Sequence, residues 1–130
     1  MPFDLRETQL ARAEKVLGAR FPDSYRQAMM RSNGGEREAL GDAWELIPIR
    51  DDSSQKRLSR TCNDVLSETD QFRLWRAWPQ RGIGIARNGV GDALVLLQEN
   101  GSVRPEVYAW WHETGSLEEV AKDFGDLPGA

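Results

Sequence analysis

Residues 82–102, with the sequence GIGIARNGVGDALVLLQENGS, constrain the fold more than any other part of the chain. Ile83 and Ile85 alternate with glycine and alanine, as expected for a short β-strand. Ala93–Leu97 is a continuous apolar run typical of a buried strand. Asn88-Gly89 lies between the two segments and is a strong hairpin signal. This part of the chain therefore predicts two strands joined by a tight turn.

More strands are predicted on both sides of this hairpin. Asn100-Gly101 marks a second turn, and the aromatic and β-branched run Val107–Trp111 predicts another strand. Trp44–Ile49 has the same character, and Pro48 favours an edge strand or a strand end there. Strands that follow one another without helices between them predict antiparallel pairing.

Helical patterns occupy the beginning of the chain. Asp4 followed by Glu7 has the spacing of a capping box, and Gly18 is placed to end the helix that it starts. A second helix is expected to begin near Pro22 and to end at Asn33-Gly34-Gly35, which enters left-handed backbone easily.

Two further helical patterns are found beyond these. One buries Leu58, Cys62, Val65 and Leu66, whereas residues 71–78 fit either a short helix or an irregular segment. The other is the clearest in the chain, since Ser116 and Glu119 have capping-box spacing and apolar residues follow at helical intervals: Leu117, Val120, Ala121 and Phe124. The sequence thus predicts a single α+β domain over residues 1–130, with a central, mainly antiparallel sheet against which N-terminal helices and a C-terminal helix pack.

The glycines of residues 82–91 do not form a nucleotide-binding loop. A dinucleotide fingerprint needs GxGxxG between a strand and a helix, but Arg87 takes the place of the third glycine and a strand follows. No Gly-Lys-Ser or Gly-Lys-Thr triplet is present. We expect no cofactor and interpret the glycines as turn residues.

Candidate catalytic residues are isolated. Asp92 follows Gly91 and is expected to bind turn amides with its carboxylate. His112 is the only histidine, and although Glu113 follows it the second histidine of HExxH is absent, so neither a metal site nor a catalytic triad is expected. Cys62 lacks a cysteine partner and is expected to be buried in packing. We therefore expect a protein that is not an enzyme.

The tryptophans allow two interpretations. Trp75 and Trp78 lie among arginines and could stack on nucleic-acid bases, but core packing is favoured for at least one of them. Trp110 and Trp111 occupy opposite faces of one strand, so one of them should be buried.

Charge is distributed unevenly along the chain. The net charge is −4, and residues 99–130 hold seven acidic residues against Arg104 and Lys122, a net charge of −5 for that segment. An acidic segment disfavours binding to nucleic acid and favours a basic partner, although a simply solvated surface is the alternative. No apolar run reaches the roughly 18 residues that span a bilayer, and no secretory signal is visible, so we expect a cytoplasmic protein without membrane contact.

Three segments, in order, resemble the SUKH superfamily of bacterial immunity proteins, to which a fungal cell-wall-synthesis regulator also belongs. They are LGARFPDSYRQAMMRSNGG (residues 17–35), GIGIARNGVGDALVL (residues 82–96) and VYAWWHETGSLEEVAKDF (residues 107–124). The resemblance implies an α+β fold and a non-catalytic protein that binds and neutralises a toxin, often a nuclease or deaminase. The matched residues are interpreted as fold markers, together with the hairpin glycine Gly89: Gly34, Gly35, Gly91, Asp92 and Trp111.

The resemblance does not transfer partner contacts to particular positions. Exposed aromatic and acidic side chains are our candidates for binding a basic toxin surface: Trp75, Trp78, Glu113, Glu118 and Glu119. The alternative is a non-catalytic interaction module with a regulatory role. Either protein is expected to be a monomer or a weak dimer.

Overall fold

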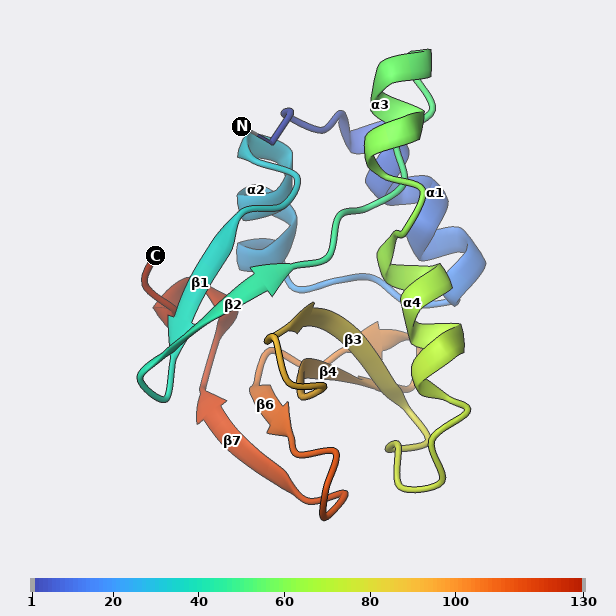
Figure 1. Cartoon of the computed structure of the whole chain (residues 1–130). Helices are drawn as coiled ribbons and strands as arrows, with labels where there is room; N and C mark the ends of the chain where they lie inside the picture. Colours follow the sequence, from blue (N-terminus) through green and yellow to red (C-terminus); the bar gives the residue numbers. More distant parts are fainter. Residues whose placement is uncertain (1, 130) are drawn as a thin grey trace.

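The computed structural model describes residues 2–129 and has an α+β fold (Figure 1). The helices are α1 (Glu7–Leu17), α2 (Asp23–Arg31), α3 (Gln55–Arg60), α4 (Val65–Phe72) and a short 3-10 helix, η1 (Phe124–Asp126). The strands are β1 (Glu36–Ala39), β2 (Asp42–Leu46), β3 (Gly82–Arg87), β4 (Ala93–Glu99), β5 (Ser102–Val103), β6 (Val107–Trp110) and β7 (Leu117–Ala121). Within the described residues, no helix is both long enough and apolar enough to cross a bilayer.

The strands form one antiparallel sheet in the order β1-β2-β3-β4-β6-β7, with β5 paired to β4. The sheet curls, so that the β1–β2 hairpin approaches the C-terminal segment (Figure 1). The amide of Glu38 in β1 donates to the carbonyl of Pro128 at 2.8 Å, and Arg37 pairs with Gly129. A central antiparallel sheet in a single α+β domain is therefore confirmed.

The two N-terminal helices lie on the inner face of this sheet. Leu10 of α1 and Tyr25 and Met29 of α2 are fully buried, as expected from their spacing. Gly18 ends α1 in the left-handed conformation at φ +78°, also as expected. Asp4 does not cap α1: the cap position is Arg6, and the Asp4 carboxylate instead accepts a hydrogen bond from Arg57 at 2.8 Å.

The sheet is buried on both faces by two apolar cores. The larger core lies between the inner face and the helices. The smaller core lies on the outer face and consists of Trp78, Ala93, Val95 and Trp110, with Phe72 packed against it. The sequence left two possibilities for residues 71–78: Gln71 and Phe72 end α4, and the others belong to an irregular segment, residues 73–81, that covers this outer face.

The expected C-terminal helix is wrong, because residues 117–121 form the edge strand β7. Leu117, Glu118 and Glu119 pair with Trp110, Ala109 and Tyr108 of β6. Helical spacing is a weak preference, whereas β6 would leave a row of backbone hydrogen-bonding groups unpaired without a neighbouring strand. The positive φ of Gly115, +73°, lets the chain turn back onto β6. Only the end of the segment is helical, as the single turn η1 with Phe124 buried.

The expected burial of Cys62 is also wrong. The predicted helix is divided into α3 and α4, and Cys62 lies exposed in the connection between them. The division follows from local capping, since the Asp64 carboxylate accepts a hydrogen bond from the amide of Leu66 and starts a new helix there.

The hairpin at Asn88-Gly89 is confirmed, with β3 and β4 antiparallel. The turn is longer than two residues and reaches Asp92. The Asn88 side chain stabilises this longer turn by accepting hydrogen bonds from the amides of Val90 and Asp92. The left-handed residue in this turn is Gly91 at φ +102°, and not Gly89.

Candidate functional site

Three connections meet beside the outer face of the sheet. They are residues 73–81 after α4, residues 88–92 between β3 and β4, and residues 111–116 between β6 and β7, which together we name the three-loop face. The indole of Trp110 donates to the carbonyl of Ala77 at 3.2 Å, and Gly115 packs so closely on Ala77 that no side chain would fit there. The first connection is thus fixed against the third.

Asp92 joins the second connection to the third. Its Oδ1 accepts a hydrogen bond from the backbone amide of His112 at 3.0 Å and lies 2.7 Å from the ring Nδ1. Since an ionised carboxylate only accepts, Nδ1 carries the proton. Oδ2 accepts from the Asn88 side chain at 3.0 Å. The carboxylate therefore does bind a turn amide, as expected, but the amide belongs to the other hairpin.

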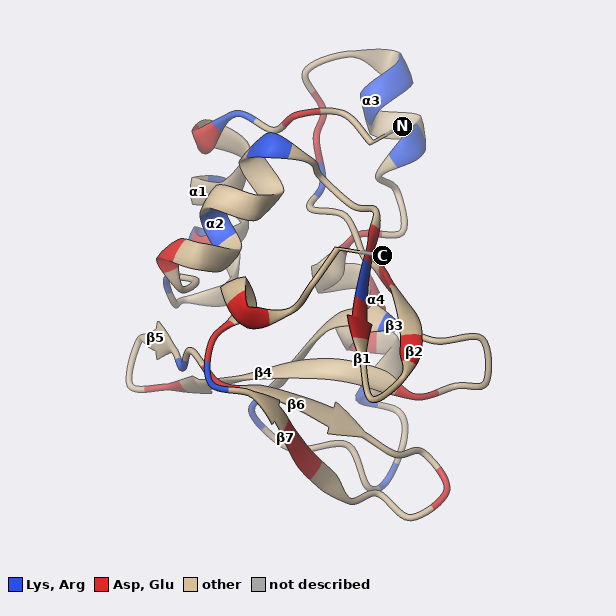
Figure 2. Cartoon of the chain, turned by 90° about the vertical axis from the view of Figure 1, so that its left-hand side faces the viewer, with Lys and Arg blue, Asp and Glu red and all other residues tan. Residues whose placement is uncertain are grey.

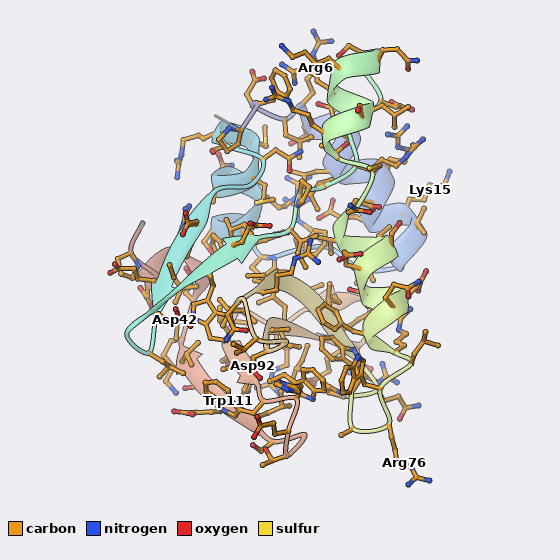
Figure 3. All side chains as sticks on the ribbon, in the orientation of Figure 1. Arg6, Lys15, Asp42, Arg76, Asp92 and Trp111 are labelled. Carbon is orange, nitrogen blue, oxygen red and sulfur yellow. The ribbon has the colours of Figure 1, made fainter. Side chains whose placement is uncertain are left out.

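The surroundings of Asp92 keep it ionised. Burial alone would raise its pKa, but hydrogen bonds from Asn88 and from the His112 ring and backbone outweigh this effect and hold the pKa below its ordinary value of 3.8. Asp92 and Trp111 lie close together at the lower end of the sheet in Figure 3, and both line a hollow of about 430 Å³. The pair Asp92–His112 is a structural clasp that holds two turns in register.

Large apolar side chains are exposed on the three-loop face. Leu74, Trp75 and Val90 are 80%, 51% and 68% exposed. The Trp75 ring meets the rings of Trp110 and His112 edge-on, with centroids 6.0 Å apart in each case. Trp75 thus presents a rigid, half-exposed aromatic surface, which is typical of a protein-binding site.

The other predicted aromatic candidate is not on the surface. Trp78 is 7% exposed, stacks on Phe72 with centroids 4.5 Å apart, and donates its indole N–H to Gly82. One of the two tryptophans is therefore a core residue. Of the next pair, Trp110 is fully buried and Trp111 is half-buried against Trp44 of β2.

Acidic segments are distributed along the curled sheet, on β1, β2, β7 and the loop that joins β6 to β7 (Figure 2). Glu113, Glu118 and Glu119 are exposed on the β6–β7 hairpin, and the β1–β2 tip lies across from β7, where Glu38, Val120 and Asp126 line one hollow. We name the exposed carboxylates of these elements the acidic surface: Glu36, Glu38, Asp42, Glu45, Glu113, Glu118, Glu119 and Asp126.

Few cations neutralise the acidic surface. Within residues 2–129, the ion pairs of these eight carboxylates are Glu119 with Lys122 at 2.8 Å and Glu45 with Arg87 at 4.0 Å. Glu36 and Glu45 lie directly opposite each other on β1 and β2. Opposed like charges destabilise a sheet, so this pair weakens the β1–β2 hairpin.

Sequence reasoning missed half of this surface. It did not predict β1, and therefore not the approach of Glu36, Glu38, Asp42 and Glu45 to β7. The sequence signal for this hairpin was weak: Leu40 and Gly41 both have positive φ, +53° and +74°, as a two-residue hairpin turn requires, but leucine is not a residue that predicts such a turn. Leu74 and Val90 were missed because no local pattern predicts which apolar side chains remain exposed.

The described side chains were also compared with the arrangement that a metal site needs. In the part of the chain that the structure describes, no three histidine, cysteine or acidic side chains lie close enough together to hold a metal ion. The described residues thus expose apolar side chains on the three-loop face and carboxylates on the acidic surface.

Comparison with protein-family profiles assigns the chain to a family. The profile of the SMI1 / KNR4 family (SUKH-1) matches residues 4–127, and the chain belongs to that family. The family comprises immunity proteins and related regulators and is generally non-catalytic. A search of curated proteins gives no match.

Proposed function

We propose that this protein is an immunity protein that neutralises a cognate bacterial toxin by binding it stoichiometrically and covering its substrate site. The observation that carries the proposal is the acidic surface, which extends over β1, β2, β7 and η1 and in which two of the eight exposed carboxylates are ion-paired within the described residues. A nuclease or a deaminase fits this surface best, because enzymes that act on nucleic acid present basic surfaces to their substrates.

The charge arrangement determines how such a complex forms. Complementary charges steer association and increase its rate, while buried apolar contacts mainly set the dissociation rate. The acidic surface is suited to steering association, and the exposed apolar side chains of the three-loop face are suited to slowing dissociation. The clasp of Asp92 and His112 keeps the three-loop face ordered before binding, which lowers the entropic cost of association.

The test is co-expression with a toxin domain, which this proposal expects the neighbouring reading frame to encode. We expect a one-to-one complex, loss of the toxin's activity on its substrate, and an association rate that falls as salt is added. Screening shortens the reach of charge to about 8 Å at physiological ionic strength. A toxin that stays fully active in excess protein would contradict the proposal and would favour the regulatory alternative.

A further inference from the structure

A hollow of about 350 Å³ lies beside Trp75 on the three-loop face. Phe72, Leu74 and Trp75 form its apolar side. Phe72 stacks on the buried Trp78 with an interplanar angle of 4°, and Trp75 rests on Trp110, so this side is fixed before anything binds. The volume falls within the range of small ligand pockets and is sufficient for one long side chain.

The charged groups that line the hollow are two carboxylates and one guanidinium group. They belong to Glu68, Asp92 and Arg87, and Arg87 is already paired with Glu68. Because the charges of this ion pair cancel, the charge that remains at the hollow is the negative charge of Asp92. Asp92 is buried, but its hydrogen bonds keep it ionised. The groups that line the hollow therefore favour a cationic occupant.

Both carboxylates can accept a further hydrogen bond. The Asp92 carboxylate accepts three, two from His112 and one from Asn88, whereas an ionised carboxylate has about four acceptor positions. Glu68 binds Arg87 through Oε1, and within residues 2–129 its Oε2 has no hydrogen-bond partner. A donor that enters the hollow can thus bind a carboxylate without breaking the hydrogen bonds that hold the hollow together.

An arginine side chain matches this combination of groups. Its guanidinium group stacks on aromatic rings such as Trp75, is weakly hydrated, and donates in a planar fork that suits carboxylates. Its methylene groups can lie against the exposed Leu74. A lysine ammonium is more strongly hydrated and does not stack on a ring as a plane. Acidic side chains and the phosphates of nucleic acid would be repelled by the carboxylates of the hollow.

We propose that this hollow is the anchor site of the partner protein, and that it receives one arginine side chain from the basic surface of that partner. The inference rests on the proposed function and specifies it, because it names the type of partner residue and the place where it binds. The acidic surface attracts the partner over a distance, and the hollow then holds one of its arginines and fixes its orientation.

The experiment compares short capped peptides of glycine and serine that differ only in the central residue, which is arginine, citrulline or phenylalanine. Citrulline has nearly the shape of arginine but no charge. Amide and indole chemical shifts of the labelled protein are followed at about pH 8, so that His112 beside Asp92 adds no positive charge. We expect saturable shifts at Trp75 and Gly91 with the arginine peptide, and roughly threefold to tenfold weaker binding of the citrulline peptide. Equal binding of these two peptides, tighter binding of the phenylalanine peptide, or no shift at these positions would overturn the inference.

Matched variants decide whether the peptide binds in the hollow. Glu68→Gln and Asp70→Asn each remove one negative charge and one arginine ion pair from α4, but of the two residues Glu68 alone lines the hollow. We expect Glu68→Gln to weaken binding of the arginine peptide several-fold, and Asp70→Asn to leave it nearly unchanged. Trp75→Ala should remove the shift of the Gly91 amide, and Trp75→Phe should retain part of it. Equal weakening by the two α4 variants, or full binding by Trp75→Ala, would refute the anchor site.

Binding to the toxin separates this inference from the proposed function. If Trp75→Ala binds the toxin as tightly as the original protein, while lysine substitutions on the acidic surface weaken binding, the anchor site is refuted and the proposed function stands. If the toxin does not bind but the arginine peptide occupies the hollow in preference to the citrulline peptide, the proposed function fails and the arginine site stands.

Discussion

Gly91 and Gly89 lie two residues apart in one turn, but only Gly91 has a conformation that demands glycine. Its φ is +102°, and a side chain there would meet the His112 ring at 3.3 Å. Gly89 has no positive φ and no atom near the place where a side chain would be. We expect Gly91→Val to lower the free energy of unfolding by about 1–3 kcal/mol, and Gly89→Val by less than about 0.5 kcal/mol. Urea unfolding of both variants measures the difference, and equal losses would contradict this description of the turn.

Tyr25 carries a polar group that the core does not satisfy. The residue is fully buried, and its hydroxyl has no hydrogen-bond partner in the described part of the chain. Its ring packs between Phe21 and Phe124, with centroids 4.8 Å and 5.2 Å away, and burial raises the pKa of the phenol.

Removing this hydroxyl should stabilise the protein. Tyr25→Phe keeps the ring contacts and eliminates an unsatisfied donor, so we expect the free energy of unfolding to rise by about 1 kcal/mol. Thermal and urea unfolding of the two proteins provide the measurement. A loss of stability would show that the hydroxyl binds an internal water molecule.

Among the elements, β7 is the one whose sequence and structure disagree most clearly. Glu118 is exposed, and replacing it by threonine or by alanine removes the same charge. A strand and a helix at this position predict opposite orders of stability for these two variants. Threonine is favoured over alanine in a strand, and alanine over threonine in a helix. We therefore expect Glu118→Thr to be more stable than Glu118→Ala, by a few tenths of a kcal/mol to about 1 kcal/mol. The reverse order in urea unfolding would favour a helix at this segment.

Elements with strong local signals could be predicted from the sequence. Gly18 ends α1, and the apolar runs of β3, β4 and β6 form the centre of the sheet. The edge strands could not be predicted, because β1 and β7 are amphipathic and acidic, and only the neighbouring strand decides their conformation. Asp4 shows the same limit at residue level, since Arg57, far away in the sequence, binds its carboxylate.

The candidate site was predictable in residue type but not in extent. The sequence predicted aromatic and acidic side chains for the site, and of these Trp75 and Glu113 are exposed next to His112. The contribution of Glu36 and Glu38 depends on the curl of the sheet, which no local pattern encodes.

For the whole molecule, we expect the rate of association with the toxin to depend more on where a charge lies than on the net charge of the protein. Three double variants, each with two acids replaced by lysine, change the net charge equally. They are Glu36→Lys with Glu38→Lys, Glu118→Lys with Glu119→Lys, and, on α1 and α2, Glu7→Lys with Asp23→Lys. We expect the first two to slow association with the toxin at low salt, and the third to slow it much less.

Stopped-flow association at several salt concentrations distinguishes these cases. The first two variants should unfold at similar temperatures, because the replaced side chains are exposed. The helical variant also loses the ion pairs of Glu7 with Arg26 and of Asp23 with Arg20, so its association is measured well below its own unfolding temperature. If the helical pair slows association as much as the other two pairs, binding depends on total charge and the acidic surface has no special role.

The tryptophans are arranged so that they report optically on the three-loop face. Of the five in the chain, Trp75, Trp78 and Trp110 touch ring to ring, and Trp111 follows in sequence and meets Trp44. Trp75 is the exposed member of this chain of indoles. A partner that covers its ring changes the environment of the whole coupled group, so the intrinsic ultraviolet emission of the protein should record occupancy of this face without any attached dye.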